Sequence, residues 1–386
     1  MNIFYYDIAI PIPIREIFTY QSKEILKSGS RVAVKFRNKD IVGYVVKQLD
    51  NKPDFSTTEI SEMLDSEPIF KSSDMQIILW LADYYHHPIG EVFDTFCPPA
   101  LRKITKTNTL LAIEEPIYIA SSEDKVFDLN KEQLNCVKEI KNLKGFDPCL
   151  LYGVTGSGKT EIYLQIADFY LSQGHSILIL VPEISLTPQL QERFINRFGD
   201  NIGIYHSRQT PKQRYDVWQK ARNGEIKIVI GTRSAVLCPL NNLGLIIVDE
   251  EHDQSYKQHE GFRFSARDVS IKRAQVENIP IILGTATPSL QTLKLVKDKK
   301  YKQINMLKRA NGSEPPGFIT LDINDSKLES GIAKESLDAI ENTLNRNKQV
   351  LIFINRRGFS PLYECNSCRW VAECKSCDAR LVFHHG

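Results

Sequence analysis

The run CLLYGVTGSGKTEIYLQIADFYL at residues 149–171 places a glycine-rich turn between an apolar stretch and a helical one. The turn is Gly153-Val154-Thr155-Gly156-Ser157-Gly158-Lys159-Thr160, which fits the pattern G-x-x-x-x-G-K-[ST]. Backbone N–H groups of such a turn face an anion, Lys159 can reach the β- and γ-phosphates, and Thr160 can ligate Mg²⁺. The alternative is a glycine-rich turn with a solvated lysine, and the flanking strand and helix favour the nucleotide site.

A second segment, LGLIIVDEEH at 243–252, offers the acids that a phosphate site needs. Asp249 ends an apolar run and is placed to hold Mg²⁺, and Glu250 follows as the carboxylate able to orient an attacking water. His252 is expected to link the nucleotide state to a neighbouring motif. A strand ending in acids can also cap the next helix, and a histidine there can lie on the surface.

Upstream of the loop, Gln133 in LNKEQLNCV could contact the adenine edge of a nucleotide. A solvent-facing helix glutamine is the alternative, and the sequence leaves both open.

Apolar runs alternate with amphipathic ones from residue 129 onward. The predicted strands are CLLYG, SILILVP, NIGIYH, IKIVIG, LGLIIVDE, IPIILGTAT and QVLIFI. This alternation predicts an α/β lobe over 129–310 with a parallel sheet and helices on both faces. Sites in such sheets lie at the carboxyl ends of the strands. Residues 311–361 are expected to hold the end of this lobe and the entry to the next region.

The N-terminal segment, residues 1–105, predicts a small β-rich domain. RVAVKF (31–36) largely alternates, and IVGYVV (41–46) follows across RNKD, which suits a hairpin. The stretch 75–87 predicts a helix that ends before Pro88. Residues 106–128 have weak periodicity and mixed charge, and we interpret them as a connector.

The composition, with 42% hydrophobic and 25% charged residues, is ordinary for a soluble globular protein. A net charge of +2 gives no global basic field, so a nucleic-acid surface would be a local patch. No apolar run approaches membrane-spanning length, and the N-terminus lacks the features of a secretory signal. We therefore expect no membrane partner and a reducing, cytoplasmic interior, where eight cysteines favour metal binding or thiols over disulfides.

Four further segments follow predicted strands and are rich in hydroxyls, glycine or arginine. They are PEISLTPQ (182–189), IGTRSAV (230–236), GTATPS (284–289) and LIFINRRGF (351–359). Such groups bond phosphate oxygens and leave base edges unread. Arg233 is the best single candidate for a contact to a nucleic-acid backbone, and an ordinary helix-start arginine is its alternative.

The segment DQSYKQHEGFRFSARD (253–268) interleaves aromatic and basic side chains. They are Tyr256, Phe262 and Phe264 with Lys257, Arg263 and Arg267. Aromatics stack on bases and cations hold phosphates, so the composition is typical of a single-strand contact loop. The alternative is a loop that covers the sheet edge with its aromatics buried.

In this order the segments resemble superfamily 2 helicases with an Asp-Glu-x-His signature, and Thr285 and Thr287 of GTATP stand at the place of the Ser-Ala-Thr coupling motif. Further blocks narrow the resemblance to the primosomal protein N′ (PriA) family of bacterial replication-restart DNA helicases. They are ADYYHHPIGEVF, GVTGSGKTE, VPEISLTPQ, IGTRSA, DEEHDQSYKQ, GTATPSL, NRRGF and the cysteine pairs near the C-terminus. DEEHDQSYKQ, NRRGF and those pairs are not shared by superfamily 2 at large.

The resemblance implies a RecA-like P-loop lobe that uses ATP with Mg²⁺ for 3′→5′ translocation on DNA. It also implies recognition of stalled or abandoned replication forks, primosome assembly, partnership with primosome proteins and single-stranded DNA-binding protein, and a monomer. An aromatic-rich loop that relays DNA binding to the ATPase site is a family feature that 253–268 resembles.

Two Cys-x-x-Cys pairs, Cys365/Cys368 and Cys374/Cys377, lie five residues apart and indicate a metal site. The resemblance implies that eight thiols in four pairs hold two Zn²⁺ ions, with each visible pair sharing an ion with a pair beyond Gly386. Residues 362–386 are thus expected to be a partial zinc module. The second motor lobe is also expected to be missing, so this chain alone should bind nucleotide weakly and bind DNA without unwinding it.

Two departures from the family concern DNA binding. The winged-helix domain that many members carry is expected to be absent, since only the connector occupies its place. The 3′-end-binding domain of the family has a Phe-Asp-Tyr run where this chain has Phe18, Thr19 and Tyr20. A threonine can still hydrogen-bond a terminal hydroxyl, with less strength, and an isolated Phe-x-Tyr in a strand is more often core.

Two other functions compete with the helicase. One is a non-catalytic module that binds DNA forks and recruits partners. The other is a different superfamily 2 translocase, such as a restriction subunit, against which DEEHDQSYKQ and the cysteine pairs argue.

Overall fold

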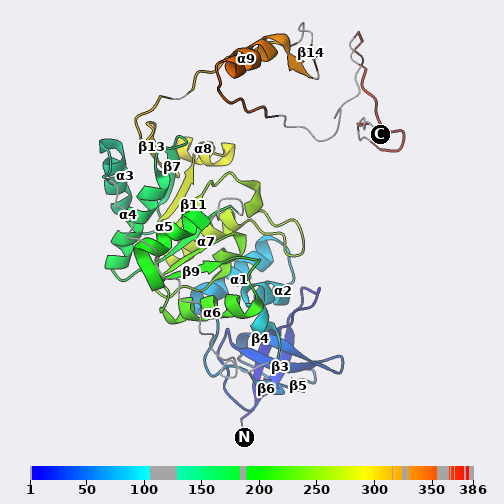
Figure 1. Ribbon diagram of the computed structural model, residues 1–386. Helices are drawn as coiled ribbons and strands as arrows, with labels where there is room; N and C mark the ends of the chain where they lie inside the picture. The colour runs from blue at the N-terminus through cyan, green and yellow to red at the C-terminus, as the bar shows by residue number, and fades with distance from the viewer. Residues whose placement is uncertain are drawn as a thin grey trace. The chain divides into compact units, whose positions relative to one another are not determined.

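The structure is a computed structural model (Figure 1) that describes residues 2–104, 128–182, 188–314, 316–323, 328–329, 331–353, 365, 367–368, 370–377 and 380–381. It divides into two compact units, Met1–Glu314 and Pro315–Gly386. Within the described residues, no helix is both long and apolar enough to cross a bilayer.

The chain begins with a β-sheet whose strand order is β5-β2-β1-β4-β3-β6. The strands are β1 (Phe4–Ala9), β2 (Phe18–Ser22), β3 (Arg31–Phe36), β4 (Lys39–Leu49), β5 (Thr58–Glu59) and β6 (Glu62–Met63). The predicted hairpin is confirmed: β3 and β4 pair antiparallel, and Phe36 pairs with Lys39 next to the turn. Arg37 and Asn38 connect them with positive φ at both residues, the backbone of a two-residue turn that matches strand twist.

Short helices follow this sheet: α1 (Ser72–Tyr84), α2 (Ile89–Phe96) and the 3₁₀ turn η1 (Pro99–Arg102). The helix predicted over 75–87 is α1, which begins three residues earlier and ends at Tyr84. Proline at position 88 disfavours helical backbone in the residue before it, and α2 starts directly after that proline.

The second sheet confirms the α/β prediction. Within the described residues it has seven parallel strands in the order β13-β7-β12-β11-β8-β10-β9 (Figure 1). They are β7 (Pro148–Gly153), β8 (Ser176–Leu180), β9 (Ile202–Tyr205), β10 (Ile228–Gly231), β11 (Leu243–Asp249), β12 (Ile281–Thr285) and β13 (Lys302–Met306). The helical elements are α3 (Lys131–Lys141), α4 (Lys159–Ser172), α5 (Pro188–Phe198), η3 (Gly199–Asn201), α6 (Pro211–Asn223), η4 (Arg233–Leu237), η5 (Gln254–Tyr256), α7 (Ala266–Glu277) and α8 (Leu290–Lys297).

Alternate residues of each strand face opposite sides of this sheet. Ile177 and Ile179 of β8 pack in a cluster with α3, α4 and α5, whereas Leu178 and Leu180 pack in a cluster with α6 and α7. Both faces are therefore covered, which explains why the strands are continuously apolar. β13 was not predicted, because KQINM at the sheet edge keeps only alternate residues buried.

The N-terminal domain packs directly against the α6/α7 face, and its helices share a hydrophobic cluster with that face. Lys71 Nζ lies 3.1 Å from Glu277 Oε1, and the Ser73 hydroxyl donates to the same oxygen at 2.9 Å. The backbone N–H of Ser265 donates to the Tyr85 hydroxyl at 3.0 Å. α1 and the start and end of α7 are thus joined by hydrogen bonds as well as by apolar packing.

The second unit is described only in part and contains β14 (Leu328–Glu329), β15 (Ile332–Ala333) and α9 (Lys334–Asn345). The strand predicted for QVLIFI is wrong over its described residues, 349–353, where no strand forms. Leu351 is 94% exposed and Phe353 is 82% exposed. An apolar run becomes a strand when neighbours pair its backbone and cover its side chains, and no described residue does so here.

Candidate nucleotide site

The phosphate loop lies between β7, which ends at Gly153, and α4, which begins at Lys159. Gly156 and Gly158 have φ of 78° and 88°, in the left-handed region that glycine enters without strain. The backbone therefore curls around the helix start, as the sequence predicted. Lys159 Nζ donates to the carbonyl of Gly153 at 3.1 Å and lies 3.5 Å from Glu250 Oε1.

Gln133 of α3 stabilises the phosphate loop by a side-chain hydrogen bond. Its side-chain amide donates to the carbonyl of Ser157 at 3.0 Å, and its Oε1 accepts from the backbone N–H of Asn130 at 2.9 Å. Gln133 is 5% exposed, so the alternative of a solvent-facing helix glutamine is wrong. Both ends of the Gln133 side-chain amide bond to protein atoms in this structure. Contact of Gln133 with an adenine edge stays a prediction.

The two acids lie at the carboxyl end of β11, opposite the loop. Oδ1 of Asp249 accepts a hydrogen bond of 2.8 Å from the hydroxyl of Tyr163 on α4. Burial is the main influence on this carboxyl and raises the pKa of Asp249 above its ordinary value. Burial, with the adjacent Asp249, likewise raises the pKa of Tyr163, which keeps its hydroxyl a donor.

Loop and acids line one cavity of about 500 Å³, together with a residue that motif patterns did not single out, Arg193 of α5. The cavity is lined by Asp128, Leu129, Asn130, Gln133, Thr155, Gly156, Ser157, Gly158, Lys159, Thr160, Glu161, Arg193, Asp249, Glu250 and Ala310. Among the residues that the structure describes, the buried Ser157 hydroxyl finds no hydrogen-bond partner. Glycines, a lysine, hydroxyls and carboxylates converging in one cavity fit a magnesium nucleotide. Thr160 and Asp249 are the candidates to hold Mg²⁺, which when bound would neutralise phosphate charge.

His252 joins the acids to GTATPS. Its Nδ1 lies 2.8 Å from the Thr285 hydroxyl, and its Nε2 lies 3.1 Å from the Thr287 hydroxyl. The Thr285 hydroxyl also donates to Glu250 Oε2 at 3.4 Å. The three side chains that the sequence assigned to coupling are therefore brought together at the ends of β11 and β12.

The segment 253–268 buries its aromatic rings. Tyr256, Phe262 and Phe264 are 2%, 5% and 2% exposed. The Phe262 ring stacks on His87 at 4.7 Å, and the Tyr256 hydroxyl donates to the Asp249 carbonyl at 2.5 Å. The rings fit the alternative interpretation, a loop that covers the sheet edge with its aromatics buried. Packing against the N-terminal domain and the sheet edge covers the ring faces on which bases would stack. Stacking on a single strand is not available to them in this structure.

The basic residues of this region differ in their partners. Arg233 Nη1 donates to the carbonyls of Ser255 and Lys257 at 3.2 and 3.0 Å, so it holds the loop itself. Lys257 and Arg263 are exposed. Arg267 bonds Glu251 and Asp268. Contacts of these four residues with DNA stay predictions.

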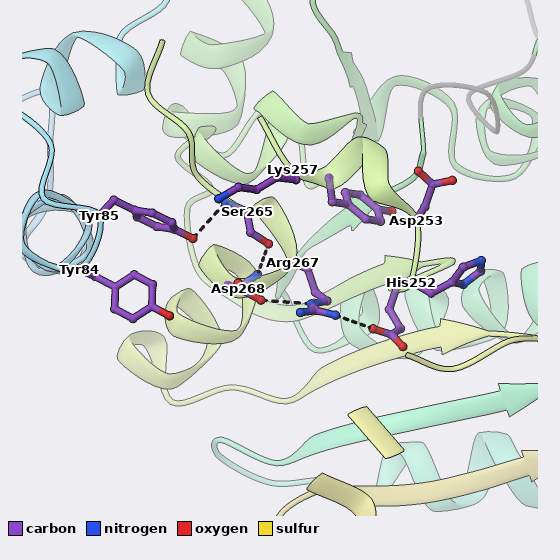
Figure 2. A pocket seen from close by; sticks show the side chains of 10 residues that line it. Tyr84, Tyr85, His252, Asp253, Lys257, Ser265, Arg267 and Asp268 are labelled. Atoms are coloured by element: carbon purple, nitrogen blue, oxygen red, sulfur yellow. Dashed lines mark hydrogen bonds and ion pairs between the residues drawn. The ribbon is translucent and has the colours of Figure 1, made fainter. Parts of the chain in front are cut away.

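A second cavity of about 320 Å³ lies beside this segment (Figure 2). Tyr84 and Tyr85 at the end of α1 form one wall, and Lys257, Ser265 and Arg267 lie opposite. The N-terminal domain and the residues next to the acids therefore share this cavity.

In β2, Phe18 packs edge-on against Phe36 at 5.2 Å, and Tyr20 is 4% exposed with its hydroxyl donating to the Lys35 carbonyl. These packing contacts match the core alternative for the pair, and DNA contact by either stays a prediction. Thr19 donates to Oδ1 of Asp7 at 3.2 Å, so a carboxylate from β1 lies beside the threonine.

The four clustered cysteines lie in the partly described second unit. Cys365 and Cys374 are half-buried, Cys368 and Cys377 are exposed, and the described residues group no three possible ligands around one point. The backbone N–H of Ser376 donates to Cys374 Sγ at 3.4 Å, and this hydrogen bond, with one from Cys377, lowers the pKa of the Cys374 thiol. Most of PEISLTPQ and the arginines of LIFINRRGF lie outside the described residues.

Comparison with known proteins agrees with this arrangement. Residues 7–98 match the family model of the PriA 3′ DNA-binding domain, and residues 130–296 match the DEAD/DEAH box helicase model. The replication restart protein PriA of Haemophilus influenzae is 44% identical over 266 residues, covering 69% of this chain and 36% of the relative. The protein of the same name from Rickettsia felis is 35% identical, covering 93% of this chain and 54% of the relative.

The chain therefore spans about half the length, or less, of the curated relatives it matches. A third relative, the replication restart protein PriA of Bacillus subtilis, is 38% identical over 70% of this chain. The matched regions follow one another as the two sheets do, a β-rich DNA-binding domain before an α/β helicase lobe. The chain belongs to the PriA family of replication restart proteins.

Proposed function

We propose that this chain belongs to an ATP-dependent DNA helicase that moves 3′→5′, acts at stalled or abandoned replication forks and restarts replication through primosome assembly. One observation carries the proposal: Lys159 of the phosphate loop lies 3.5 Å from Glu250, in the same cavity as Asp249. His252 connects these acids to Thr285 and Thr287, which gives hydrolysis a path to the rest of the motor.

The residues have distinct tasks in this mechanism. The loop N–H groups and Lys159 bind phosphate, and Glu250 orients the attacking water. Asp249, held by Tyr163, would contribute a carboxylate to a bound Mg²⁺, whose charge would offset that of the phosphates. Glu250 and His252 both contact Thr285. A shift of either side chain during hydrolysis would therefore move GTATPS.

Zinc is proposed for the cysteine pairs on the chemistry of the donor set. Cys365, Cys368, Cys374 and Cys377 are the proposed ligands. Primosome proteins and single-stranded DNA-binding protein are proposed partners on family membership alone.

The test is ATP turnover, with and without single-stranded DNA, by this chain and by a form extended past Gly386. We expect the chain to bind nucleotide weakly with little turnover and no unwinding, and the extended form to show DNA-stimulated turnover. Lys159→Ala should abolish turnover in both, with Lys138→Ala, at an exposed position of α3, as the matched control. Turnover that survives Lys159→Ala would contradict the phosphate-loop assignment. DNA binding without turnover in either form would favour a fork-binding, partner-recruiting module.

A further inference from the structure

The second acid after Asp249, Glu251, differs from its neighbours in having no exposure. Its side chain is 0% exposed, whereas those of Glu250 and His252 are 30% and 36% exposed. The backbone N–H of Glu251 donates to the Gly284 carbonyl at 3.1 Å, so the residue lies where the carboxyl ends of β11 and β12 are side by side. Glu250 lines the nucleotide cavity and His252 contacts GTATPS, whereas Glu251 lines the cavity of Figure 2 together with Arg267.

Four donors surround the Glu251 carboxylate. Oε1 accepts from the backbone N–H of Ser289 at 2.7 Å. Oε2 accepts from the hydroxyls of Ser289 and Thr292 at 3.1 Å each and from Arg267 Nη1 at 3.2 Å. A buried carboxylate is costly unless it is paired and hydrogen-bonded in this way. Apolar side chains would fill the same space at less cost, so the group is expected to serve a specific contact.

These partners belong to two other segments. Ser289 caps α8 and is the last residue of GTATPS, and Thr292 lies in the first turn of that helix. Arg267 lies at the start of α7, also bonds Asp268 and Gln291, and forms part of the wall of the cavity in Figure 2. The buried Glu251 carboxylate therefore connects the residues after β11 to the end of GTATPS and to Arg267, which lines the cavity of Figure 2.

GTATPS is consequently fixed at both ends. Thr285 is held in β12, and Ser289 is held by Glu251. Between these points, Thr285 and Thr287 contact the His252 ring. Because residue 251 is covalently between 250 and 252, the Glu251–Ser289 contact sets how far His252 lies from Thr287.

We propose that Glu251 is a positioning residue for ATP hydrolysis, which holds the coupling contact of His252 with GTATPS in register and connects that contact to Arg267. Glu251 is not among the residues that line the nucleotide cavity. The inference rests on the proposed function, since it assigns Glu251 a task within that reaction.

Glu251→Gln tests the proposal, because it keeps the shape and replaces one acceptor oxygen with an N–H₂ group facing donors. In the extended, turnover-competent form we expect the kcat for ATP to fall about tenfold to a hundredfold, as small misplacements do. KM for ATP should stay nearly unchanged, because Lys159 and Asp249 are untouched. Glu139→Gln, at an exposed position of α3, is the matched control and should behave as wild type.

A second measurement does not depend on turnover. In this chain, Glu251→Gln should shift the His252 imidazole nitrogen resonances and speed amide exchange over 284–292, whereas Glu251→Asp should partly restore both. Wild-type resonances and exchange in Glu251→Gln would overturn the inference, as would equal losses of kcat and nucleotide affinity. If the extended wild-type form shows no turnover, the proposed function fails and the resonances measured on this chain still decide the inference. Should Glu251→Gln not fold, Thr292→Val, which removes one donor, is expected to give the same shifts at smaller size.

Discussion

The hydroxyl of Tyr163 on α4 donates a hydrogen bond of 2.8 Å to Oδ1 of Asp249 at the end of β11, across a sequence separation of 86 residues. α4 starts in the phosphate loop, so the helix that carries Lys159 at its first residue also orients the acid expected to hold Mg²⁺. The loop and the candidate metal ligand are thus both positioned by α4.

Tyr163→Phe should weaken magnesium-dependent nucleotide binding. The change removes one hydrogen bond and leaves the buried ring, so we expect a loss of about 1 kcal/mol, or roughly fivefold in affinity. Titration with a fluorescent nucleotide, with Mg²⁺ and then with EDTA, measures it. The difference between variant and wild type should disappear in EDTA. Tyr152→Phe, in the neighbouring strand β7, is the control, and an equal loss with EDTA would show that Tyr163 acts by packing alone.

Gly284 has a steric role that predicts a rescue. A Cβ atom at this position would lie 1.8 Å from the Tyr163 hydroxyl and 3.1 Å from Cζ of the same ring. Gly284→Ala should therefore displace Tyr163, destabilise the lobe and weaken nucleotide binding. Adding Tyr163→Phe removes the atom that clashes most, so the double variant should melt above Gly284→Ala alone. Thermal melting of the four proteins gives the coupling, and strict additivity would exclude this clash as the cause.

Asp249→Asn should raise stability while removing magnesium binding. The folded protein raises the pKa of Asp249, mainly through burial, and so holds a proton that the unfolded chain has already lost. This contribution to stability is complete below the unfolded pKa and is lost as pH rises through the folded pKa. At neutral pH the ionised acid is therefore a cost to the metal-free fold, and the amide should stabilise it by on the order of 1 kcal/mol.

Melting in EDTA at neutral and at acid pH checks this sign. The gain from Asp249→Asn should be present at pH 7 and shrink on acidification, and Mg²⁺ with nucleotide should stabilise wild type alone. Asp200→Asn, an exposed acid, serves as control. A variant that melts below wild type at pH 7 in EDTA would contradict the burial argument.

Zinc content of this chain should depend on Cys374. The backbone N–H of Ser376 stabilises its thiolate, the form that binds metal. Cys374→Ser should lower the zinc per chain measured by atomic absorption, whereas Cys136→Ala, a buried cysteine of the lobe, should leave it unchanged. The same zinc content in all three proteins would exclude the cysteine pairs as the site.

Much of the nucleotide site could be predicted from local sequence. Gly156, Gly158 and Lys159 are fixed by a loop whose conformation depends on residues next to one another. The β3–β4 hairpin was likewise predicted from two adjacent runs. The strand predicted for QVLIFI was wrong over its described residues, because an apolar run becomes a strand only when a sheet is present to pair with it. The aromatics of 253–268 show the same limit, since their spacing indicates stacking surfaces and their burial depends on His87 and Tyr85 of another domain.

The sequence by itself determined the phosphate loop, the acids after it and the alternation that produces a parallel sheet, because each depends on contacts between near neighbours in the chain. The tertiary structure alone decided that Tyr163 holds Asp249, that Gln133 supports the loop and that Glu251 is buried against Ser289 and Arg267. Such hydrogen bonds join residues far apart in sequence. A distant donor leaves no local pattern, so the partner of a buried polar group becomes known when the elements that carry both are packed together.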